Sequence, residues 1–348
     1  MRTSYLRFVV LHVIHIVEKE DYMLELVRKL KDLVLQYPER RSKAQKEQFI
    51  NEINSFLSRT TWTIKSKKES VLSVLSVQNV YINCSDITNR DVLLMAHYDT
   101  PKSIFPLIPY FSKKFGMFAG ILILLGVLVI FEFGLMLIVD QSIFYLFIIL
   151  FVCLLLFGKN NPQNTNDNSS GVIAALAISQ YIMQEKSELI DRIGIILTDK
   201  EESGLIGSGA VVKLLKAARK KDSKYQPLIL NFDSVGVPRF LYLEQGKHVC
   251  IKKNLKNKLD SQLSCFENTG KFSPLGVMSD LYFLKKEKCF GFIFLQKSEC
   301  LDSYYLANVH TAQDTYIDDI HLAHFCKKIS NFIIEYLENP NQDPNASR

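Results

Sequence analysis

A histidine and an aspartate lie one residue apart at the end of an aliphatic run, in the stretch VLLMAHYDTPKSI over residues 92–104. His97 and Asp99 could be a metal ligand and the carboxylate that orients it. They could equally be the polar edge of a strand, because a short His-x-Asp motif occurs often by chance. The pair therefore indicates a metal site only if the rest of the chain supplies further ligands.

Further candidate ligands occur where predicted strands end or where a predicted helix begins. They are Asp167, Glu201, Glu202, Asp233 and His310. Taken alone, each could be a helix cap, a turn residue or a surface side chain. Taken together, histidine nitrogens and carboxylate oxygens at one sheet edge are the ligands that a pair of zinc-like ions needs.

Strand and helix patterns alternate along the polar part of the chain. The predicted strands cover residues 71–83, 91–96, 192–199, 227–233 and 290–296, and the predicted helices cover 169–185, 207–221 and 319–338. This alternation predicts an α/β fold, a three-layer α/β/α sandwich with a mostly parallel central sheet. Ligands of such sheets bind beyond the carboxyl ends of the strands, which is where the candidate residues lie.

Composition narrows the class of protein. The chain has 348 residues, 48% of them hydrophobic and 22% charged, which suits one large globular domain or two modest ones. The net charge of +6 is spread over lysine clusters without interleaved aromatic residues, so no nucleic-acid partner is expected. The seven cysteines are scattered and form no C-x-x-C pair, which is typical of reduced thiols in a cytosolic domain.

An apolar block interrupts the chain. Residues 115–139 carry one charge, Glu132, and are long enough to cross a hydrocarbon core of about 30 Å as a helix. A second apolar run, residues 143–157, would reach only about 23 Å, so it would span by thinning the bilayer or be re-entrant. The block predicts a hydrophobic helical hairpin that contacts membrane lipid through residues 115–157.

The charges that flank this block predict its orientation. Lys102, Lys113 and Lys114 precede the first apolar run and Lys159 follows the second, whereas the turn between them has no basic residue. Basic residues favour the cytoplasmic side. The expected location is therefore the cell membrane, as a multi-pass or re-entrant hairpin with the catalytic domain in the cytoplasm.

The same observations divide the chain into segments. An apolar N-terminal segment (1–22), whose role as an anchor stays open, precedes a metallopeptidase domain (23–100 and 159–338), an inserted membrane hairpin (101–158) and a polar tail (339–348).

Five motifs carry a resemblance to a known family. AHYDT, NDNSSGV, EESGLIGS, NFDSVG and VHTAQDT, in this order, resemble the motifs of the zinc-dependent aminopeptidases that include bacterial leucyl aminopeptidase and aminopeptidase Y. Glutamate carboxypeptidase and glutaminyl cyclase are related to that family. The resemblance covers about residues 23–100 and 160–338 and implies a phosphorylase/hydrolase-like zinc exopeptidase fold. The fragment GVMSDLYFL departs from the family pattern, because Leu281 stands where histidine is usual, so substrate contacts there are not expected to follow the family.

The resemblance also implies a role for each candidate residue. It implies two zinc ions, which manganese or cobalt can replace, and an activity that removes N-terminal residues from peptides. One ion would be held by His97 and Asp233, the other by Glu202 and His310, and Asp167 would bridge them. Asp99 would orient His97, and Glu201 would be the general base.

Other functions remain open at this point. A carboxypeptidase would share every metal ligand, and a glutaminyl cyclase would use the same fold with one zinc ion. A non-catalytic membrane receptor or scaffold is disfavoured, because Glu201 and all five ligands are present. The oligomeric state and the preferred side chain of the peptide substrate also stay open.

Overall fold

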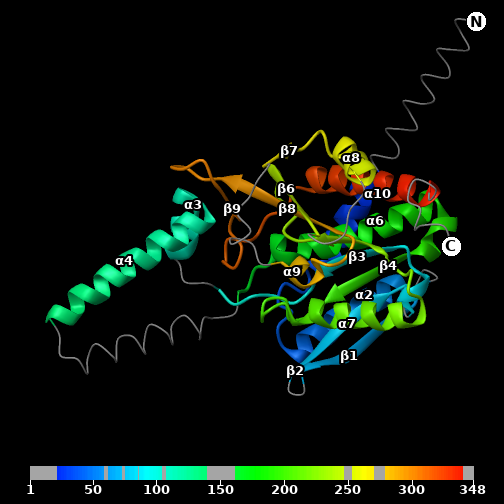
Figure 1. Ribbon diagram of the computed structural model, residues 1–348, viewed down its shortest axis with the longest axis horizontal. Helices are drawn as coiled ribbons and strands as arrows, with labels where there is room; N and C mark the ends of the chain where they lie inside the picture. The colour runs from blue at the N-terminus through cyan, green and yellow to red at the C-terminus, as the bar shows by residue number, and fades with distance from the viewer. Residues whose placement is uncertain are drawn as a thin grey trace, which may run out of the picture.

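A nine-stranded sheet with helices on both faces forms the centre of the molecule (Figure 1). The computed structural model describes residues 22–58, 62–72, 75–84, 86–103, 107–138, 161–246, 253–269 and 279–339. The strands are β1 (Ile64–Leu72), β2 (Leu75–Ile82), β3 (Val92–His97), β4 (Ile193–Thr198), β5 (Leu228–Phe232), β6 (Phe240–Gln245), β7 (Glu267–Asn268), β8 (Cys289–Lys297) and β9 (Tyr304–Tyr305).

Helices cover the sheet and connect its strands. A first helix spans residues 22–34. The others are α2 (Lys43–Leu57), α3 (Leu107–Phe115), α4 (Met117–Ile138), α6 (Gly171–Glu185), α7 (Ile206–Lys221), α8 (Lys253–Gln262), α9 (Leu281–Leu284) and α10 (Asp319–Glu338). Three short helical turns are η1 (Ile87–Asn89), η2 (Thr165–Ser170) and η3 (Ser187–Arg192).

Strand direction changes from the centre of the sheet to its edges. The order is β1-β2-β4-β3-β5-β8-β6-β7, and β9 pairs with β8. The four central strands, β4, β3, β5 and β8, run parallel. The pairs β1–β2, β2–β4, β6–β8 and β8–β9 are antiparallel. The predicted α/β fold is therefore confirmed, but only the centre of the sheet is mostly parallel.

One predicted strand is wrong. Residues 71–83 were expected to form a single strand, but they contain the end of β1 and the whole of β2, which form an antiparallel hairpin. Most of β1 is the lysine-rich segment IKSKKESVL. Charged side chains are common on edge strands, where they prevent pairing with other chains. They are equally common in exposed loops, so the charge of this segment did not identify it as a strand.

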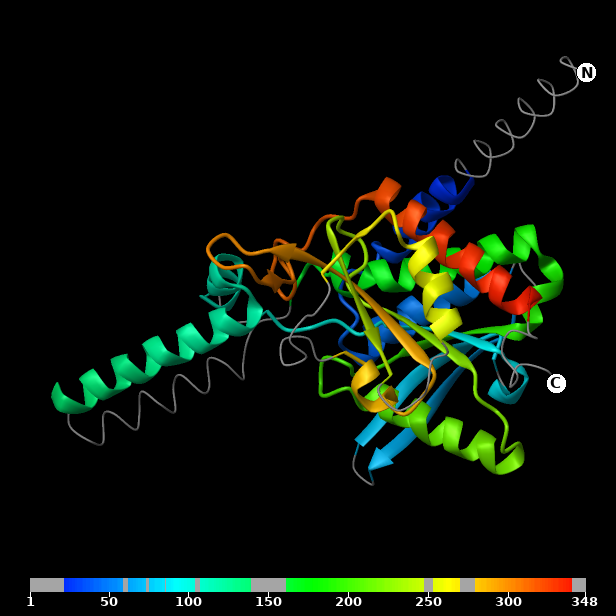
Figure 2. The same cartoon turned by 45° about the horizontal axis from the view of Figure 1, so that its top comes forward.

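The central strands are buried on both faces. Along β3, Val92 and Leu94 belong to the core that includes α6 and α10. Leu93 and Met95 point the other way, into the core formed with α7 and α9. Alternate side chains of a strand face opposite sides of the sheet, so a strand covered on both faces must be apolar throughout. Figure 2 shows the two helical layers from a second direction.

Helices α3 and α4 form an arm that projects from this domain (Figure 1). They join at Gly116, whose φ of +83° favours glycine, and a Cβ there would lie 1.9 Å from Ser303 Oγ. The loop after β8 caps the end of α3, since the Glu299 and Cys300 amides donate to the carbonyls of Lys113 and Lys114. Ser303 Oγ donates to the Phe115 carbonyl at 2.7 Å. The base of the arm is thus fixed to the loop that leads into β9.

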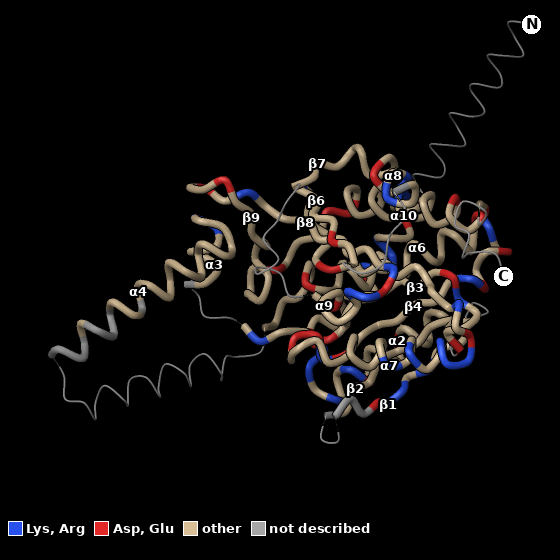
Figure 3. Tube along the Cα trace, viewed as in Figure 1, with Lys and Arg blue, Asp and Glu red and all other residues tan. Residues whose placement is uncertain are grey.

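The predictions of a membrane hairpin and of a cell-membrane location are contradicted. No helix in the described part of the chain combines the length and hydropathy needed to cross a bilayer. The first apolar run does not form one helix from residue 115, because the chain turns at Gly116 and docks on the domain there. Hydropathy reports only apolar composition, and few charged residues lie along the described part of this arm (Figure 3). The second run, 143–157, lies outside the described residues, as do 1–21 and 340–348.

His321, near the start of α10, is a half-buried histidine whose pKa is lowered by burial. Its amide donates to the helix-capping Asp318 at 2.9 Å, and its ring meets the Phe294 ring edge-on with centroids 4.4 Å apart. Burial lowers the pKa of His321 from 6.5 to about 4, although the nearby Asp318 carboxylate acts in the opposite direction. The folded protein therefore holds this imidazole neutral.

Replacing His321 by phenylalanine should remove part of the acid sensitivity of the fold. The unfolded chain protonates this histidine near pH 6.5 and the folded chain only near pH 4, so its contribution to stability is complete above pH 6.5 and is lost between these values. Urea unfolding of wild type and His321→Phe from pH 8 to pH 4 measures this. The difference in free energy of unfolding between wild type and the variant should be constant above pH 7. Below pH 6, wild type should lose stability relative to the variant. A difference that stays constant over the whole range would contradict the assignment.

Candidate metal centre

Three parallel strands end at one edge of the sheet, and each is followed by candidate ligands. His97 is the last residue of β3, and Glu201 and Glu202 follow β4. Asp233 follows β5. Because the three strands run in the same direction, their carboxyl ends bring these side chains together.

Two loops supply the remaining candidates. Asp167 lies in the turn η2, directly before α6. His310 lies in the loop after β9 and has a φ of +58°. The sequence separates His97 from Asp167 by the whole α3–α4 arm, yet His97 Nε2 and Asp167 Oδ1 are 3.2 Å apart.

The five predicted ligands form two groups that share one residue. His97, Asp167 and Asp233 make the first group, and Asp167, Glu202 and His310 make the second. His97 Nε2 lies 3.9 Å from Asp233 Oδ1. His310 Nε2 lies 3.0 Å from Asp167 Oδ2 and 3.2 Å from Glu202 Oε2. Asp167 thus faces one histidine with each of its oxygens.

These separations suit metal ligands. Zinc binds nitrogen and oxygen donors at about 2.0–2.1 Å in a tetrahedral arrangement, which places neighbouring donor atoms about 3.3 Å apart. The measured separations of 3.0 to 3.9 Å lie around that value. Glu202 Oε1 is buried and has no hydrogen-bond partner among the described residues, as expected of an atom reserved for a cation. The residues present therefore fit zinc.

Protonation of the cluster reflects its crowded charges. Burial disfavours the charged forms of His97 and His310, but the surrounding carboxylates outweigh burial and raise the pKa of both well above the ordinary value. Burial raises the pKa of Asp233 to about 7. The pKa of Asp167 is lowered, because its interactions with His310 and His97 outweigh its burial. Cations that bind here would displace protons and compensate the same negative charge.

Asp99 does not hold His97 in the way the sequence suggested. Its carboxylate oxygen Oδ1 lies 3.7 Å from His97 Nδ1, too far for a hydrogen bond. The nearer group is the backbone carbonyl of Asp99, at 3.2 Å from His97 Nδ1. The carboxylate instead accepts the amide N–H of Glu201 at 3.0 Å, so Asp99 links the ends of β3 and β4.

Two residues that the sequence reasoning did not single out hold the Asp167 turn. Asp314 accepts the amide groups of Asn166 at 2.7 Å and Asp167 at 3.0 Å. Asn168 donates to the Phe232 carbonyl at 2.9 Å, which ties this turn to the end of β5. Both residues lie within the quoted motifs. A polar side chain that binds backbone groups follows no regular spacing in the sequence, so the motifs alone did not indicate this role.

The position that departs from the family pattern points away from the metal centre. Leu281 is buried, belongs to the core under α7 and packs against Gly291. The preceding Asp280 is also buried and accepts a hydrogen bond from Thr198 Oγ1 at 2.5 Å. Leu281 therefore contributes packing rather than a polar contact.

Comparison with known proteins identifies similar sequences and folds. Residues 158–333 match the sequence profile of peptidase family M28. No curated protein sequence matches the chain. The chain is similar to the LapA aminopeptidase of Legionella pneumophila, with a TM-score of 0.51 and 15% identity, covering 91% of this chain and 73% of that one.

Two further structures are similar over nearly their whole length. One is the glutaminyl cyclase of Porphyromonas gingivalis, with a TM-score of 0.55 and 14% identity, covering 91% of this chain and 98% of that one. The other is a Zn-dependent exopeptidase from Parabacteroides distasonis, with a TM-score of 0.55 and 15% identity, covering 90% and 97%. At these identities the likeness shows a shared fold.

Removing the Asp314 carboxylate should destabilise the fold. Asp314→Ala leaves two buried amide groups without their acceptor, and hydrogen bonds to a charged group contribute about 1.5 kcal/mol each or more, so a loss of about 3 kcal/mol or more is expected. Urea unfolding of the metal-free protein at pH 8 measures it, above the pKa of about 7 to which burial raises this carboxyl. Asp318→Ala, which removes a helix cap from α10, is the control and should cost about 1 kcal/mol. Equal losses in the two variants would contradict the role given to Asp314.

Proposed function

The chain belongs to peptidase family M28, and from this membership and the geometry of the site we propose that it is an aminopeptidase with two zinc ions. As a member of this family it is a metal-dependent hydrolase. The aminopeptidase activity and the number of ions are the proposed part.

One observation carries the proposal of two ions, namely that Asp167 is shared between two ligand groups. Its Oδ1 lies 3.2 Å from His97 Nε2, and its Oδ2 lies 3.0 Å from His310 Nε2. A carboxylate in this position can bridge two cations, as dinuclear hydrolases require. His97 and Asp233 would complete the first site, and Glu202 and His310 the second.

When bound, zinc lowers the pKa of water and polarises the scissile carbonyl. Glu201 would act as the general base, taking the proton of the attacking water and passing it to the leaving amine. Its position supports this role, since its carboxylate lies within 4.8 Å of donor atoms of His97 and Glu202. Its amide is held by Asp99 Oδ1 at 3.0 Å, which fixes the start of the loop after β4.

A glutaminyl cyclase is the second candidate, because the P. gingivalis glutaminyl cyclase is similar over 98% of its chain. The presence of both His97 and Asp233 supports the aminopeptidase, since these two residues would serve a second ion. A carboxypeptidase would share the whole ligand set and would differ in its specificity pocket.

Metal content and a substrate panel together test the proposal. The full chain, with zinc, manganese or cobalt added in turn, should bind two equivalents of metal and hydrolyse aminoacyl p-nitroanilides that have a free amino group. N-acetylated substrates should resist, because the proposed activity requires the free N-terminus. One bound equivalent with cyclisation of N-terminal glutamine would support the cyclase instead. Cleavage of N-blocked acidic dipeptides would support the carboxypeptidase.

Neighbouring glutamates should separate catalysis from metal binding. Glu201→Gln should retain the fold and the metal but lower turnover by about 10²-fold or more, as expected for loss of a general base. Glu202→Gln should lose metal, because it replaces a ligand oxygen of the second group. Atomic absorption and steady-state kinetics on the two variants measure both effects. Full turnover in Glu201→Gln would remove this residue from the mechanism.

A further inference from the structure

Arg40 is a fully buried arginine in the segment before α2, outside the part of the chain that matches the family. Its solvent-exposed fraction is 0%. A buried guanidinium must exchange its water for other partners. Arg40 Nε donates to the Tyr98 carbonyl at 2.6 Å, Nη1 donates to the Tyr37 carbonyl at 2.7 Å, and Nη2 donates to Ser169 Oγ at 3.0 Å.

Two of these partners, Tyr98 and Ser169, lie on the two segments that carry ligands of the first group. Tyr98 stands between His97 and Asp99, and Ser169 lies two residues after Asp167. The backbone amide of Arg40 adds a bond to Thr100 Oγ1 at 2.9 Å, on the same segment as His97. One residue therefore ties the end of β3 to the Asp167 turn.

Ring contacts fix the direction of this side chain. The guanidinium lies over the Phe49 ring of α2, 5.0 Å from its centroid, and Phe49 in turn stacks on Tyr98 at 5.9 Å. A planar group with donors in a fixed fork and a ring against its face has little freedom to turn.

Arg40 keeps its charge although it is buried. Asp99, Asp167 and Asp314 are close enough to raise the pKa of Arg40, although burial dominates and lowers that pKa to about 10. The side chain is thus still a cation at neutral pH.

We infer that Arg40 is a positioning residue of the metal centre, whose fork of hydrogen bonds sets the distance between His97 and Asp167. This inference rests on the proposed function, because it assigns Arg40 a task for the zinc ligands. Residues behind metal ligands that fix their orientation commonly determine metal affinity.

Metal affinity distinguishes positioning from ordinary packing. Replacing a residue that only stabilises the fold lowers the stability of the metal-free and metal-loaded proteins alike. It leaves the zinc affinity of the folded protein unchanged. A residue that sets the ligand geometry changes the affinity itself. The visible spectrum of bound cobalt reports the geometry directly.

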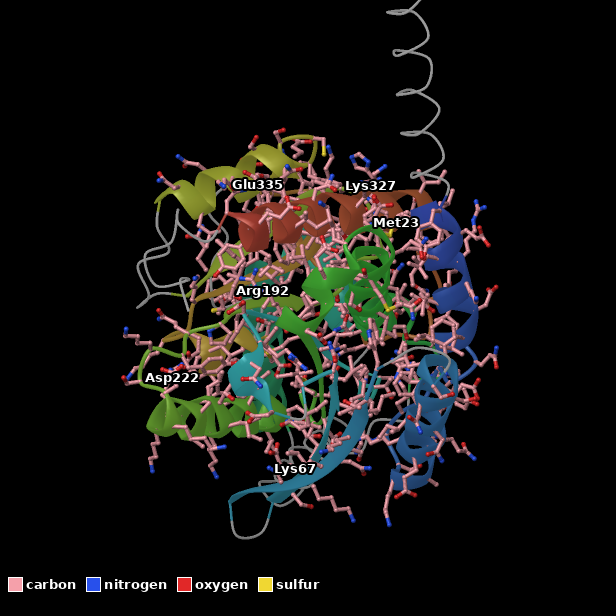
Figure 4. The ribbon with its side chains drawn as sticks, turned by 90° about the vertical axis from the view of Figure 1, so that its right-hand side faces the viewer. Met23, Lys67, Arg192, Asp222, Lys327 and Glu335 are labelled. Carbon is pink, nitrogen blue, oxygen red and sulfur yellow. The ribbon has the colours of Figure 1, made fainter. Side chains whose placement is uncertain are left out.

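The test compares Arg40→Met with Arg192→Met in the full chain. Arg192 is the control, since it too donates to a backbone carbonyl, that of Leu337, and it pairs in addition with the Asp91 carboxylate. It precedes β4, at the opposite end of that strand from the metal centre, and is labelled in Figure 4. Zinc affinity is measured by competition with a chromophoric chelator, alongside the cobalt spectrum and the melting temperature of the metal-free protein.

Arg40→Met should lower zinc affinity by about 10- to 100-fold and alter the cobalt spectrum. Arg192→Met should lower the melting temperature and leave affinity and spectrum as in wild type. Arg40→Lys should also bind zinc more weakly than wild type, because an ammonium keeps the charge but lacks the fork. Wild-type affinity and spectrum in Arg40→Met, or in Arg40→Lys, would overturn the inference.

A second variant covers the case in which Arg40→Met does not fold. Ser169→Ala removes the acceptor of Nη2 and also the hydrogen bond from Ser169 Oγ to the Asn164 carbonyl at 2.6 Å, and it should weaken zinc binding in a folded protein. Unchanged affinity in Ser169→Ala would overturn the inference in that case. If wild type itself bound no zinc, the proposed function would be contradicted. If wild type and the Arg40 variant bound zinc equally well, only the inference about Arg40 would be contradicted.

Discussion

Acidic side chains are buried where the parallel strands end, and a charge that has left water needs a compensating partner. They are those of Asp99, Asp167, Asp199, Glu201, Asp233, Asp280 and Asp314. Several are compensated within the protein: Lys46 of α2 forms an ion pair with Asp199, and Thr198 donates to Asp280. Asp167 and Asp233 face the two histidines, and Ser234 Oγ also donates to Asp233 Oδ1 at 3.1 Å. The arrangement of the strand ends, the turn before α6 and the segment before α2 all follow from this distribution of negative charge.

Much of this centre could be predicted from the sequence, because its ligands follow strands with strong patterns. The runs that precede His97 and Asp233 are apolar apart from Asn231, as is typical of strands buried on both faces. Parallel strands end at one edge, so polar residues after several such runs are expected to meet. The structure does bring His97, Asp167, Glu202, Asp233 and His310 together. Their roles as ligands of two ions remain predictions.

What the sequence did not reveal are interactions between distant segments that leave no local pattern. Arg40 and Ser169 are 129 positions apart, and the four letters around Arg40 resemble any charged surface loop. Lys46 of α2 is buried against Asp199, although a lysine is seldom fully buried and its type gives no sign of such a partner. The sequence also did not indicate that the lysine-rich segment β1 is a strand. Charged residues indicate that one side of a segment contacts solvent, but they say nothing about its backbone hydrogen bonds. At α3 and α4, by contrast, apolar composition led to the prediction of a membrane hairpin.

The docking of α3 on the loop over residues 299–303 determines where the apolar insertion can be excised. Its last carbonyls are the acceptors for the Glu299 and Cys300 amides, and Ser303 binds the Phe115 carbonyl. A deletion that began before Leu107 would strip these acceptors from the segment that continues through β9 to His310. A deletion that began after Gly116 would leave them in place. The boundary of the peptidase body on this side therefore lies at the corner between the two helices, at Gly116, one residue after the apolar run begins at residue 115.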